Sequence, residues 1–293
     1  MSFFSQLRKA ASPEKAEAPV LLGSRVVGNL SPIKAVAGGN AINKAGRLVL
    51  KGASTGKSVK VFEAANPAHA EFIRSVSCQP ELISHLPTVH SVASHLLVLE
   101  WIEGNAFEPH SSISTEKMAR LLVRFHSTPL TPLPPPEFDY WQDFIKPRFR
   151  RAAAFADAKV ATKVETEVCE YLAKKTLFLS HPDVTPVNLI VSREIFLISI
   201  DNELLCTSGE PIFDVLNSAR PLKPQWAEKL LDHYLEGYQR ALPPLSVVRS
   251  FWLAREAGSA FAAGRIDRLR RLFDAYLSGE PLLSAGLEQR FSK

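Results

Sequence analysis

Short apolar runs separated by small and polar residues occupy the first hundred residues of the chain. Three of these runs are PIKAVA (32–37), RLVLKG (47–52) and SVKVFEA (58–64). Glycine-containing breaks lie between them, at 38–40 and 53–56. Runs of this length bounded by glycine turns are typical of β-strands. The pattern predicts a small antiparallel sheet in this part of the chain.

A helix and a second hairpin follow these strands. Asn66 is suited to cap a helix and Pro67 to occupy its first turn, which the segment AHAEFIRSV continues. The apolar runs LPTVHSV (86–92) and HLLVLEWI (95–102) then predict two paired strands, ended by a Glu-Gly-Asn break. We interpret residues 23–102 as a β-rich N-terminal lobe.

Helical patterns dominate the rest of the chain. They cover residues 118–126, 141–175, 224–242, 246–263 and 265–278. Prolines and glycine separate several of them, and the proline-rich segment 130–138 is predicted to be a surface loop. The whole pattern predicts an α+β protein with a flexible arm over 1–22, a small antiparallel-sheet N-lobe over 23–102 and a larger, mainly helical C-lobe over 103–293.

Composition agrees with a folded protein of one large domain or two lobes. The chain has 293 residues, of which 46% are hydrophobic and 22% charged, as in an ordinary globular protein. The formal net charge is +5, but the basic residues are scattered along the chain. Nucleic-acid binding would need a clustered patch or a known module. We therefore expect no nucleic-acid partner.

Cysteine usage and hydropathy indicate the compartment. The three cysteines stand far apart without CxxC spacing, as expected for reduced thiols of a cytosolic protein. No run approaches about eighteen apolar residues, and the first residues lack the apolar core of a secretory signal. We expect a cytoplasmic protein without a membrane span, and the sequence leaves its oligomeric state open.

The stretch FLSHPDVTPVNLIVSREIFLISIDNE (178–203) combines strand patterns with a set of polar residues. These polar residues are His181, Asp183, Asn188, Asp201 and Glu203. LIV (189–191) and IFLISI (195–200) flank a tight polar break, a pattern that predicts a hairpin. Such a hairpin would place Asn188 and Asp201 side by side, with Asp183 on the loop that enters it.

These side chains suit metal-assisted chemistry. Asp183, Asn188 and Asp201 supply oxygen atoms, which Mg²⁺ prefers as ligands, and one carboxylate would remain free to act as a base. Each residue alone could be an ordinary turn residue, because Asp and Asn are common in turns. Their convergence at this spacing favours the interpretation as a site.

Two segments are candidates for binding a nucleotide, and the first is GASTGKS at 52–58. It resembles a phosphate-binding P-loop with Lys57 and Ser58, but only three residues separate its glycines, where the motif needs four. A P-loop also opens a helix, whereas the residues that follow suit a strand. A hairpin turn is the favoured interpretation, and a P-loop hydrolase is the alternative.

The second candidate is a two-lobed nucleotide clamp. The glycine turn at Gly38 and Gly39 would let the backbone approach phosphates, and Lys60 would reach the α- and β-phosphates. Glu71 on the next helix would hold that lysine. Lys51 is the alternative lysine, and Lys60 is favoured because its strand directly precedes the helix.

The residues between the predicted lobes would complete this clamp. Glu100, Trp101 and Ile102 end the second hairpin, and backbone groups there would hold the edge of an adenine ring. ATP or another nucleoside triphosphate, together with Mg²⁺, is therefore the expected cofactor.

Five segments carry a resemblance to the aminoglycoside phosphotransferase and choline kinase superfamily, which has the protein-kinase-like fold. They are LVLEWIEG (97–104), MARLLVRFHSTPL (118–130), HPDVTPVN (181–188), ISIDNE (198–203) and GEPIFDVLN (209–217). The resemblance covers roughly residues 25–220. The His-x-Asp-x4-Asn pattern followed by Ile-Asp-x-Glu is its most specific part.

The resemblance implies a role for each residue of the central motif. Asp183 would be the catalytic base, and Asn188 and Asp201 would hold Mg²⁺ against the β- and γ-phosphates. Glu203 would assist through a metal-bound water or a substrate contact, and His181 would brace the loop. In the last segment, Asp214 would be a structural anchor.

Two departures from the family pattern concern the loops. Pro182 replaces the glycine usual between the histidine and the aspartate, which stiffens the catalytic loop but leaves its side chains available. The glycine turn of the N-lobe is also atypical of the family, so the choice between ATP and GTP is left open.

The spacing after Asp201 indicates the class of acceptor. A protein kinase has a long activation segment there that ends in Ala-Pro-Glu, whereas Gly209-Glu210-Pro211 follows closely in this chain. We therefore expect a kinase that phosphorylates a hydroxyl group of a small molecule. From Arg220 onward, basic residues outnumber acidic ones, which favours a neutral or anionic acceptor such as a sugar.

Two other functions stay open at this point. A kinase that modifies aminoglycosides would need an acidic cleft for its polycationic substrate. A non-catalytic binding or scaffold protein could keep the fold without turnover, and the poor glycine loop favours it, whereas the intact base and metal ligands oppose it.

Overall fold

The computed structural model describes most of the chain after the first strands. The described residues are 20–22, 25–27, 31–32, 49–54, 57–156, 158–192 and 196–292. Side chains are described from Val59 onward. Gly38 and Gly39, most of the strand expected at 32–37 and most of the arm over 1–22 lie outside the described residues.

The chain forms two compact units. The first, here called the sheet unit, comprises Met1–Phe107, Thr131–Glu137 and Val187–Glu203. The second, called the helical unit, comprises Glu108–Leu130, Phe138–Pro186 and Leu204–Lys293. Two later segments of the chain therefore belong to the same unit as the N-terminal strands. The lobe limits at 23–102 and 103–293 stay a prediction.

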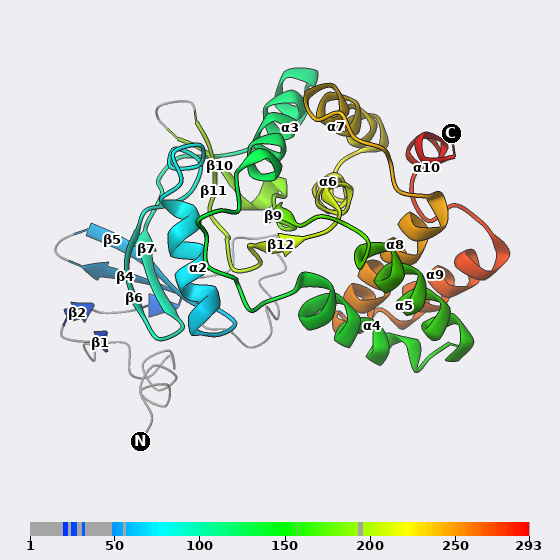
Figure 1. Ribbon diagram of the computed structural model, residues 1–293, viewed down its shortest axis with the longest axis horizontal. Helices are drawn as coiled ribbons and strands as arrows, with labels where there is room; N and C mark the ends of the chain where they lie inside the picture. Colours follow the sequence, from blue (N-terminus) through cyan, green and yellow to red (C-terminus); the bar gives the residue numbers. More distant parts are fainter. Residues whose placement is uncertain are drawn as a thin grey trace. The chain divides into compact units, whose positions relative to one another are not determined.

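A five-stranded antiparallel sheet forms the centre of the sheet unit (Figure 1). Its strands, in spatial order, are β3 (Ser31–Pro32), β4 (Val49–Ser54), β5 (Lys57–Glu63), β7 (Leu96–Glu100) and β6 (Val89–Ala93). A separate antiparallel pair is formed by β1 (Val20–Leu22) and β2 (Arg25–Val27). The predicted antiparallel sheet is confirmed within these residues.

The hairpin of β4 and β5 decides between the two nucleotide-binding candidates. Its register begins with Ser54 opposite Lys57, so the segment after Gly56 is a strand. A P-loop needs a helix at that position to present its backbone N–H groups to phosphates. The P-loop alternative is therefore wrong, and the predicted hairpin is confirmed.

Strand β5 has two distinct faces because successive side chains alternate. Val59 and Val61 are buried on one face, each 1% exposed. Lys60 lies between them and points to the other face, where its ammonium group lies over the Phe62 ring. Phe62, the next residue on the face of Lys60, is also 1% exposed, so both faces of β5 are covered.

Helix α2 (Pro67–Ser77) packs against β6 and β7 in the sheet unit (Figure 1). Its cap is the predicted one, since Asn66 Oδ1 accepts a hydrogen bond of 2.7 Å from the backbone N–H of His69. Pro67 occupies the first turn, where its missing N–H costs nothing. Phe72 and Val76 lie fully buried on the inner side of the helix.

A three-stranded sheet confirms the predicted central hairpin. Its strands are β8 (Asn105–Ala106), β10 (Leu189–Val191) and β11 (Leu197–Ser199), with β10 in the middle. Gly104 precedes β8 at a point of very close approach. A Cβ atom on it would clash with Ile190 Cγ2 and with the Val191 carbonyl oxygen, so only glycine fits here.

The helical unit contains most of the helices of the chain. Those described are α3 (Ser112–Ser127), the π-helical turn η1 (Tyr140–Ile145), α4 (Lys146–Ala153), α5 (Ala158–Leu172), α6 (Pro211–Ala219), α7 (Pro224–Gly237), α8 (Leu245–Ala262), α9 (Ile266–Ser278) and α10 (Ala285–Phe291). A short sheet pairs β9 (Phe178–Ser180) with β12 (Cys206–Ser208). Helices α6 and α10 were not predicted.

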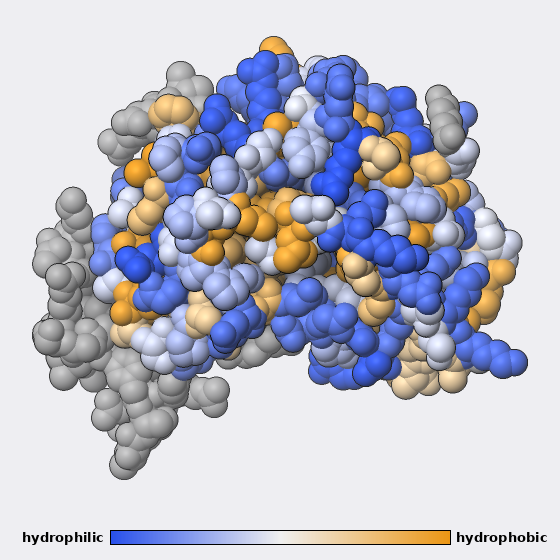
Figure 2. Space-filling view, viewed as in Figure 1, coloured by the Kyte–Doolittle hydropathy of each residue, from blue (hydrophilic) through white to orange (hydrophobic). Residues whose placement is uncertain are grey.

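Helix packing in this unit follows the apolar stripes. Helix α3 lies beside α7, and α8 lies beside α4, α5 and α9 (Figure 1). The Phe213 ring of α6 stacks on the Phe251 ring of α8, with centroids 3.8 Å apart. Over α3 and α7 the visible surface is predominantly hydrophilic (Figure 2). Among the described residues, no helix is both long and apolar enough to span a membrane.

Helix α3 begins earlier than the apolar pattern predicts. The structure places its first residue at Ser112 rather than near Met118. Ser111 and Ser114 form a capping box, in which each side chain satisfies a backbone N–H of the other. The cap offsets the weak helix propensity of the serine-rich first turn.

Candidate active site

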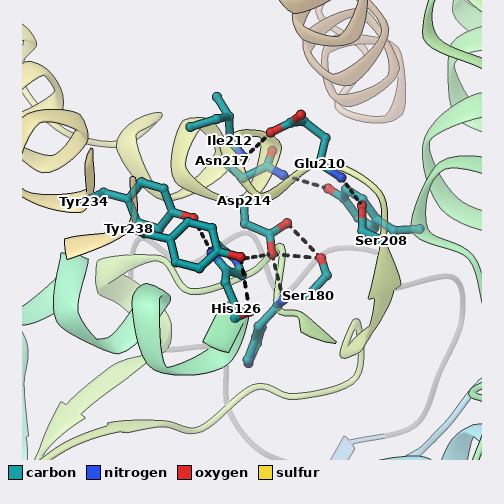
Figure 3. Close-up of polar contacts among 11 residues, drawn as sticks. His126, Ser180, Ser208, Glu210, Ile212, Asp214, Asn217, Tyr234 and Tyr238 are labelled. Carbon is teal, nitrogen blue, oxygen red and sulfur yellow. Dashed lines mark hydrogen bonds and ion pairs between the residues drawn. The ribbon is translucent and has the colours of Figure 1, made fainter. Parts of the chain in front are cut away.

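The loop that carries Asp183 is held at its start by Asp214 of helix α6 (Figure 3). The Asp214 carboxylate is 1% exposed. It accepts hydrogen bonds of 2.8 and 2.9 Å from the Ser180 hydroxyl and one of 2.8 Å from the His181 backbone N–H. It also lies 3.1 Å from His126 Nε2. Asp214 is therefore the structural anchor that the family resemblance implies.

His126, at the end of α3, connects this anchor to helix α7 (Figure 3). Its Nε2 lies against the Asp214 carboxylate, which can only accept, so this nitrogen carries a hydrogen. The Tyr234 hydroxyl lies 2.7 Å from Nδ1, and burial raises the pKa of this phenol well above its usual range. A neutral phenol that donates to Nδ1 fixes the imidazole in one orientation.

The histidine of the catalytic loop has a bracing role. The His181 side chain is fully buried, and its ring makes an edge contact with Phe125 at a centroid distance of 5.0 Å. Its backbone N–H is bound by Asp214. These contacts agree with the structural role expected for His181.

Asp183 itself is only partly buried in the helical unit. Its carbonyl accepts a hydrogen bond of 2.8 Å from the Thr185 N–H, which closes a tight turn. Its carboxylate interacts electrostatically with Arg220, Arg255 and Tyr140. The candidate base therefore lies in an environment that contains two guanidinium groups and a phenol.

Tyr140 is the buried phenol of this environment. Burial raises its pKa to about 12, Arg255 opposes the shift, and the negative charge of Asp183 adds to it. The phenol is therefore neutral in the physiological range. Tyr140 is the first residue of the π-helix η1, a geometry that is often found at functional sites.

The sheet unit contains the other candidate residues. The Lys60 ammonium group lies 2.6 Å from the carbonyl oxygen of Ile200 and 3.7 Å from Asp201 Oδ1. The two charged side chains are 13% and 19% exposed. β5 supplies the lysine and the end of the β10–β11 hairpin supplies the aspartate. The fold thus joins two predicted site residues that are far apart in the chain.

The hairpin register places Asn188 and Asp201 at the same end of the hairpin. The Ile200 N–H donates a hydrogen bond of 2.9 Å to the carbonyl of Asn188, which extends the ladder of β10 and β11 by one residue pair. Asp201 follows directly. Both side chains carry oxygen atoms suited to Mg²⁺. Glu203, the third predicted ligand, has a side chain that is 1% exposed.

The structure does not bring Lys60 and Glu71 together. Glu71 Oε2 instead accepts a hydrogen bond of 2.7 Å from Arg74 Nε, and these two side chains are 47% and 51% exposed. The two residues lie one turn apart on the outer side of α2, where an i,i+3 pair forms readily. The expected lysine–glutamate pair is therefore corrected to Lys60–Asp201.

Backbone register also bears on the alternative lysine. Lys51 of β4 is the backbone register partner of Lys60 of β5. The choice of Lys60 as the phosphate-binding residue stays a prediction. The contact with Asp201 is what distinguishes Lys60 among the described side chains.

The residues predicted to contact adenine lie at the end of strand β7 and directly after it. β7 ends at the exposed Glu100, whose N–H donates a hydrogen bond of 2.9 Å to the Thr88 carbonyl. Trp101 and Ile102 are partly exposed and lead toward Gly104. Their role as nucleotide contacts stays a prediction.

Sequence reasoning missed several residues that hold the helical unit together around the loop. These are Ser180, Tyr140, Asn217, Tyr234 and Arg255. Each lies in an apolar helix or strand, where a single polar residue carries no distinctive spacing. The signal that could have found them is a polar residue at an otherwise buried helical position.

The element order defines the class of protein. An antiparallel sheet with one packed helix precedes a helical unit with a His-x-Asp loop, and a hairpin ending in Asp201 follows that loop. This is the protein-kinase-like fold, as expected. The profile of the phosphotransferase enzyme family (APH) matches residues 43–247. The chain belongs to this family.

Solved structures of small-molecule kinases share the fold. Choline kinase LicA from Streptococcus pneumoniae is 15% identical with a TM-score of 0.56, covering 94% of this chain and 100% of its own. A structure of LicA in complex with AMP is 14% identical with a TM-score of 0.53, covering 93% and 96%. A putative fructosamine-3-kinase from Haemophilus somnus is 11% identical with a TM-score of 0.58, covering 86% and 92%. No curated protein sequence matches the chain.

Proposed function

We propose that this protein is an ATP- and Mg²⁺-dependent kinase that phosphorylates a hydroxyl group of a small molecule. The observation that carries the proposal is the contact of Lys60 with Asp201, 3.7 Å apart in the sheet unit. In kinases a strand lysine contacts the nucleotide phosphates while an aspartate holds Mg²⁺ against them, so both residues belong to the phosphate site. Membership of the phosphotransferase family supports the same chemistry.

Nucleotide binding is assigned to the sheet unit. Lys60 would contribute its positive charge to the phosphates, and the backbone of 100–102 would contact the base. The structure of LicA contains AMP, which supports an adenine nucleotide as the donor.

The available oxygen atoms fit Mg²⁺. This ion takes one or two protein oxygen ligands and completes its shell with water and phosphate oxygens. Asn188 and Asp201, at one end of the hairpin, would supply such ligands. Within the described part of the chain there is no group of three or more His, Cys, Asp or Glu side chains placed to hold a metal. When bound, the ion would neutralise charge on the phosphates.

Asp183 is assigned the role of base. The acceptor hydroxyl oxygen forms a bond to the γ-phosphorus, the bond from that phosphorus to the ADP oxygen breaks, and ADP leaves. Asp183 takes the proton that the hydroxyl loses. Asp214 would position this carboxylate indirectly, because it holds Ser180 and the His181 backbone at the start of the same loop.

Replacing the base tests the proposal. Asp183→Asn should reduce turnover by about 10²- to 10⁴-fold, the range of general-base contributions, and should leave the affinity for ATP-Mg²⁺ nearly unchanged. ADP release measured over a panel of sugars, sugar acids, amino alcohols and aminoglycosides gives turnover, and calorimetry gives nucleotide affinity.

The matched control is Asp267→Asn, since the Asp267 side chain is 92% exposed on α9. This variant should retain wild-type turnover. Equal turnover in Asp183→Asn and wild type would contradict the assignment of the base.

A second candidate function is a binding or scaffold protein without turnover. The observation in its favour is the position of Glu71, which pairs with Arg74 rather than with Lys60. Thermal unfolding with and without ATP-Mg²⁺, together with the acceptor panel, distinguishes the two functions. A scaffold would show no ADP release with any acceptor, and wild-type release would exclude it.

A further inference from the structure

One face of helix α6 connects the catalytic loop to two arginines. Asp214, Asn217 and Arg220 follow one another at intervals of three residues, and Arg220 is the cap residue at the end of the helix. Asp214 holds the loop that leads to Asp183. One turn later, Asn217 Oδ1 accepts a hydrogen bond of 3.2 Å from Arg255 Nε. The same short helix therefore positions both the loop and the arginines.

The hydrogen bonds of Arg255 go to neutral groups. Besides Asn217, its guanidinium donates to the Ser259 hydroxyl and to the Tyr140 phenol. Asn217 Nδ2 in turn lies 3.5 Å from the Tyr140 oxygen. Across the described ranges, no carboxylate forms an ion pair with Arg255. The hydrogen bonds of Arg255 therefore neutralise none of its charge, and the carboxylates of Glu256 and Asp183 act on it electrostatically without an ion pair.

Arg220 lies in the same cluster. Its Nη1 is 3.5 Å from Glu256 Oε1, and Glu256 is the neighbour of Arg255 on helix α8. The Glu256 carboxylate is 3% exposed and is shared with Arg268. One carboxylate thus serves two guanidinium groups, with Arg255 directly beside it. With Asp183 counted, the three guanidinium groups of Arg220, Arg255 and Arg268 share two carboxylates, so the cluster has an excess of one positive charge.

The electrostatics agree with this geometry. Burial lowers the pKa of Arg220, and the positive charge of Arg255 lowers it further, whereas Glu256 and Asp183 raise it. A like charge that lowers the pKa of a group lies close to that group. Asp183 also raises the pKa of Arg255, against the effect of burial. Both arginines therefore lie within electrostatic reach of the candidate base.

We propose that Arg255 and Arg220 bind an anionic group of the acceptor, so that the substrate is a hydroxylated small molecule bearing a phosphate or a carboxylate. This inference rests on the proposed kinase function and narrows its substrate class. The planar guanidinium fork matches both anions through paired hydrogen bonds. Both arginines are partly exposed, as is Asp183, so a ligand can reach them.

The same cluster disfavours polycationic acceptors. An ammonium group placed beside two guanidinium groups would meet like charges at short range, and repulsive elements of this kind set specificity as strongly as attractive ones. Asn217 accepts a hydrogen bond from Arg255 Nε, and the Tyr140 phenol is a further hydrogen-bond partner of Arg255, so both residues hold its guanidinium in position. The site is therefore built around a fixed positive charge.

Related acceptors with and without an anionic group test the inference. We would compare glycerol with glycerol 3-phosphate and glycerate, and glucose with glucose 6-phosphate and glucuronate, by measuring kcat and KM for each. Wild type should prefer at least one anionic series over its neutral parent by about tenfold or more. Comparing the phosphate-bearing acceptors with the carboxylate-bearing ones shows which anion the site binds.

Arg255→Gln should reduce the preference for anionic over neutral acceptors by about tenfold to hundredfold, which corresponds to the loss of one hydrogen bond to a charged group. The loss should appear in KM for the anionic acceptors and leave the neutral ones unchanged. Arg220→Gln should act in the same direction, and it offers a second readout if the first variant unfolds at a lower temperature. Arg270→Gln is the control, since this arginine is 66% exposed on α9.

Three outcomes would overturn the inference. One is a wild-type enzyme that prefers neutral acceptors or does not discriminate by charge. Another is an Arg255→Gln variant in which kcat falls equally for neutral and anionic acceptors, which would assign the arginine to the transferred phosphate or to the loop. The third is an absence of calorimetric binding of all four anionic acceptors to wild type.

Calorimetry separates this inference from the proposed function. Binding of an anionic acceptor that is lost in Arg255→Gln supports the anion site even if no phosphate is transferred. Absence of ADP release with every acceptor would then count against the kinase function alone.

Discussion

Lys60 is the residue whose surroundings bear most directly on nucleotide binding. Its ammonium group crosses from β5 to the end of the hairpin, where it contacts the Ile200 carbonyl and the Asp201 carboxylate. Only 13% of its side chain is exposed, so little water surrounds the charge. A cation that is partly desolvated and already held in position interacts more strongly with phosphates than a free surface lysine.

The first prediction at the residue scale concerns this lysine. Lys60→Met should keep the packing of the aliphatic stem and remove the charge. We expect the dissociation constant for ATP-Mg²⁺ to rise about tenfold to hundredfold, the value of a charge-assisted hydrogen bond. Isothermal titration calorimetry measures it.

Lys117→Met provides the control, since Lys117 is exposed on α3 in the helical unit. Its nucleotide affinity should equal that of wild type. If Lys60→Met bound the nucleotide as tightly as this control, the lysine would have no phosphate-binding role, and Lys51 would become the better candidate.

At the scale of elements, helix α6 connects the parts of the helical unit. It spans only nine residues, all of which are buried. Its N-cap Glu210 accepts a hydrogen bond of 3.0 Å from the Ile212 N–H (Figure 3). Glu210 also accepts one of 2.7 Å from the Tyr171 hydroxyl. Asp214 in its middle binds two loop donors and His126. Nearly all polar groups of this helix therefore form hydrogen bonds, which hold the neighbouring segments in place.

The prediction at this scale concerns the anchor. Asp214→Ala should lower the free energy of unfolding by about 3–5 kcal/mol, because it leaves buried donors without their acceptor. Urea unfolding followed by tryptophan fluorescence measures the change. The variant should also lose most of its turnover, since the catalytic loop loses its attachment.

Asp267→Ala is the matched change at an exposed aspartate. It should alter stability by less than about 0.5 kcal/mol, as surface substitutions do. A loss below about 1 kcal/mol in Asp214→Ala would show that the anchor contacts are replaced by other groups.

At the scale of the whole molecule, phenols set the alkaline limit of stability. Burial raises the pKa of Tyr140 to about 12, and it also raises the pKa of Tyr171 and Tyr234. In the unfolded chain a tyrosine titrates near pH 10. Between about pH 10 and 12 the unfolded state therefore loses protons that the folded state keeps. Stability is full below pH 10 and falls as the pH rises.

Tyr140→Phe tests this dependence. Urea unfolding of wild type between about pH 9 and 11.5 should show a steep fall above pH 10. In the variant the slope should be shallower by about 1.4 kcal/mol per pH unit, which corresponds to one proton. Identical slopes in both proteins would show that Tyr140 titrates normally in the fold.

Local patterns in the sequence determined much of this protein. Short apolar runs separated by turn residues predicted β4, β5, β6 and β7, and the Asn-Pro start predicted helix α2. The polar break near residue 193 predicted the hairpin that places Asn188 and Asp201 at one end. These features depend on interactions between residues close in the chain. Such interactions can be predicted from the periodicity of apolar residues and from the residue types in turns. The motif of 181–203 indicated the family for the same reason.

Tertiary structure decided which charged groups meet. Lys60 pairs with Asp201 rather than Glu71, a contact between residues that are more than a hundred positions apart. Arg255 reaches Asn217 only because α8 packs where α6 ends. Long-range pairing follows from the packing of whole elements, and neither charge nor spacing along the chain specifies it. The kinase motif was therefore readable from the sequence, and the excess of basic residues after Arg220 already favoured a neutral or anionic acceptor. Only the fold brought Arg220 and Arg255 into one cluster, on which the proposal of an anionic acceptor rests.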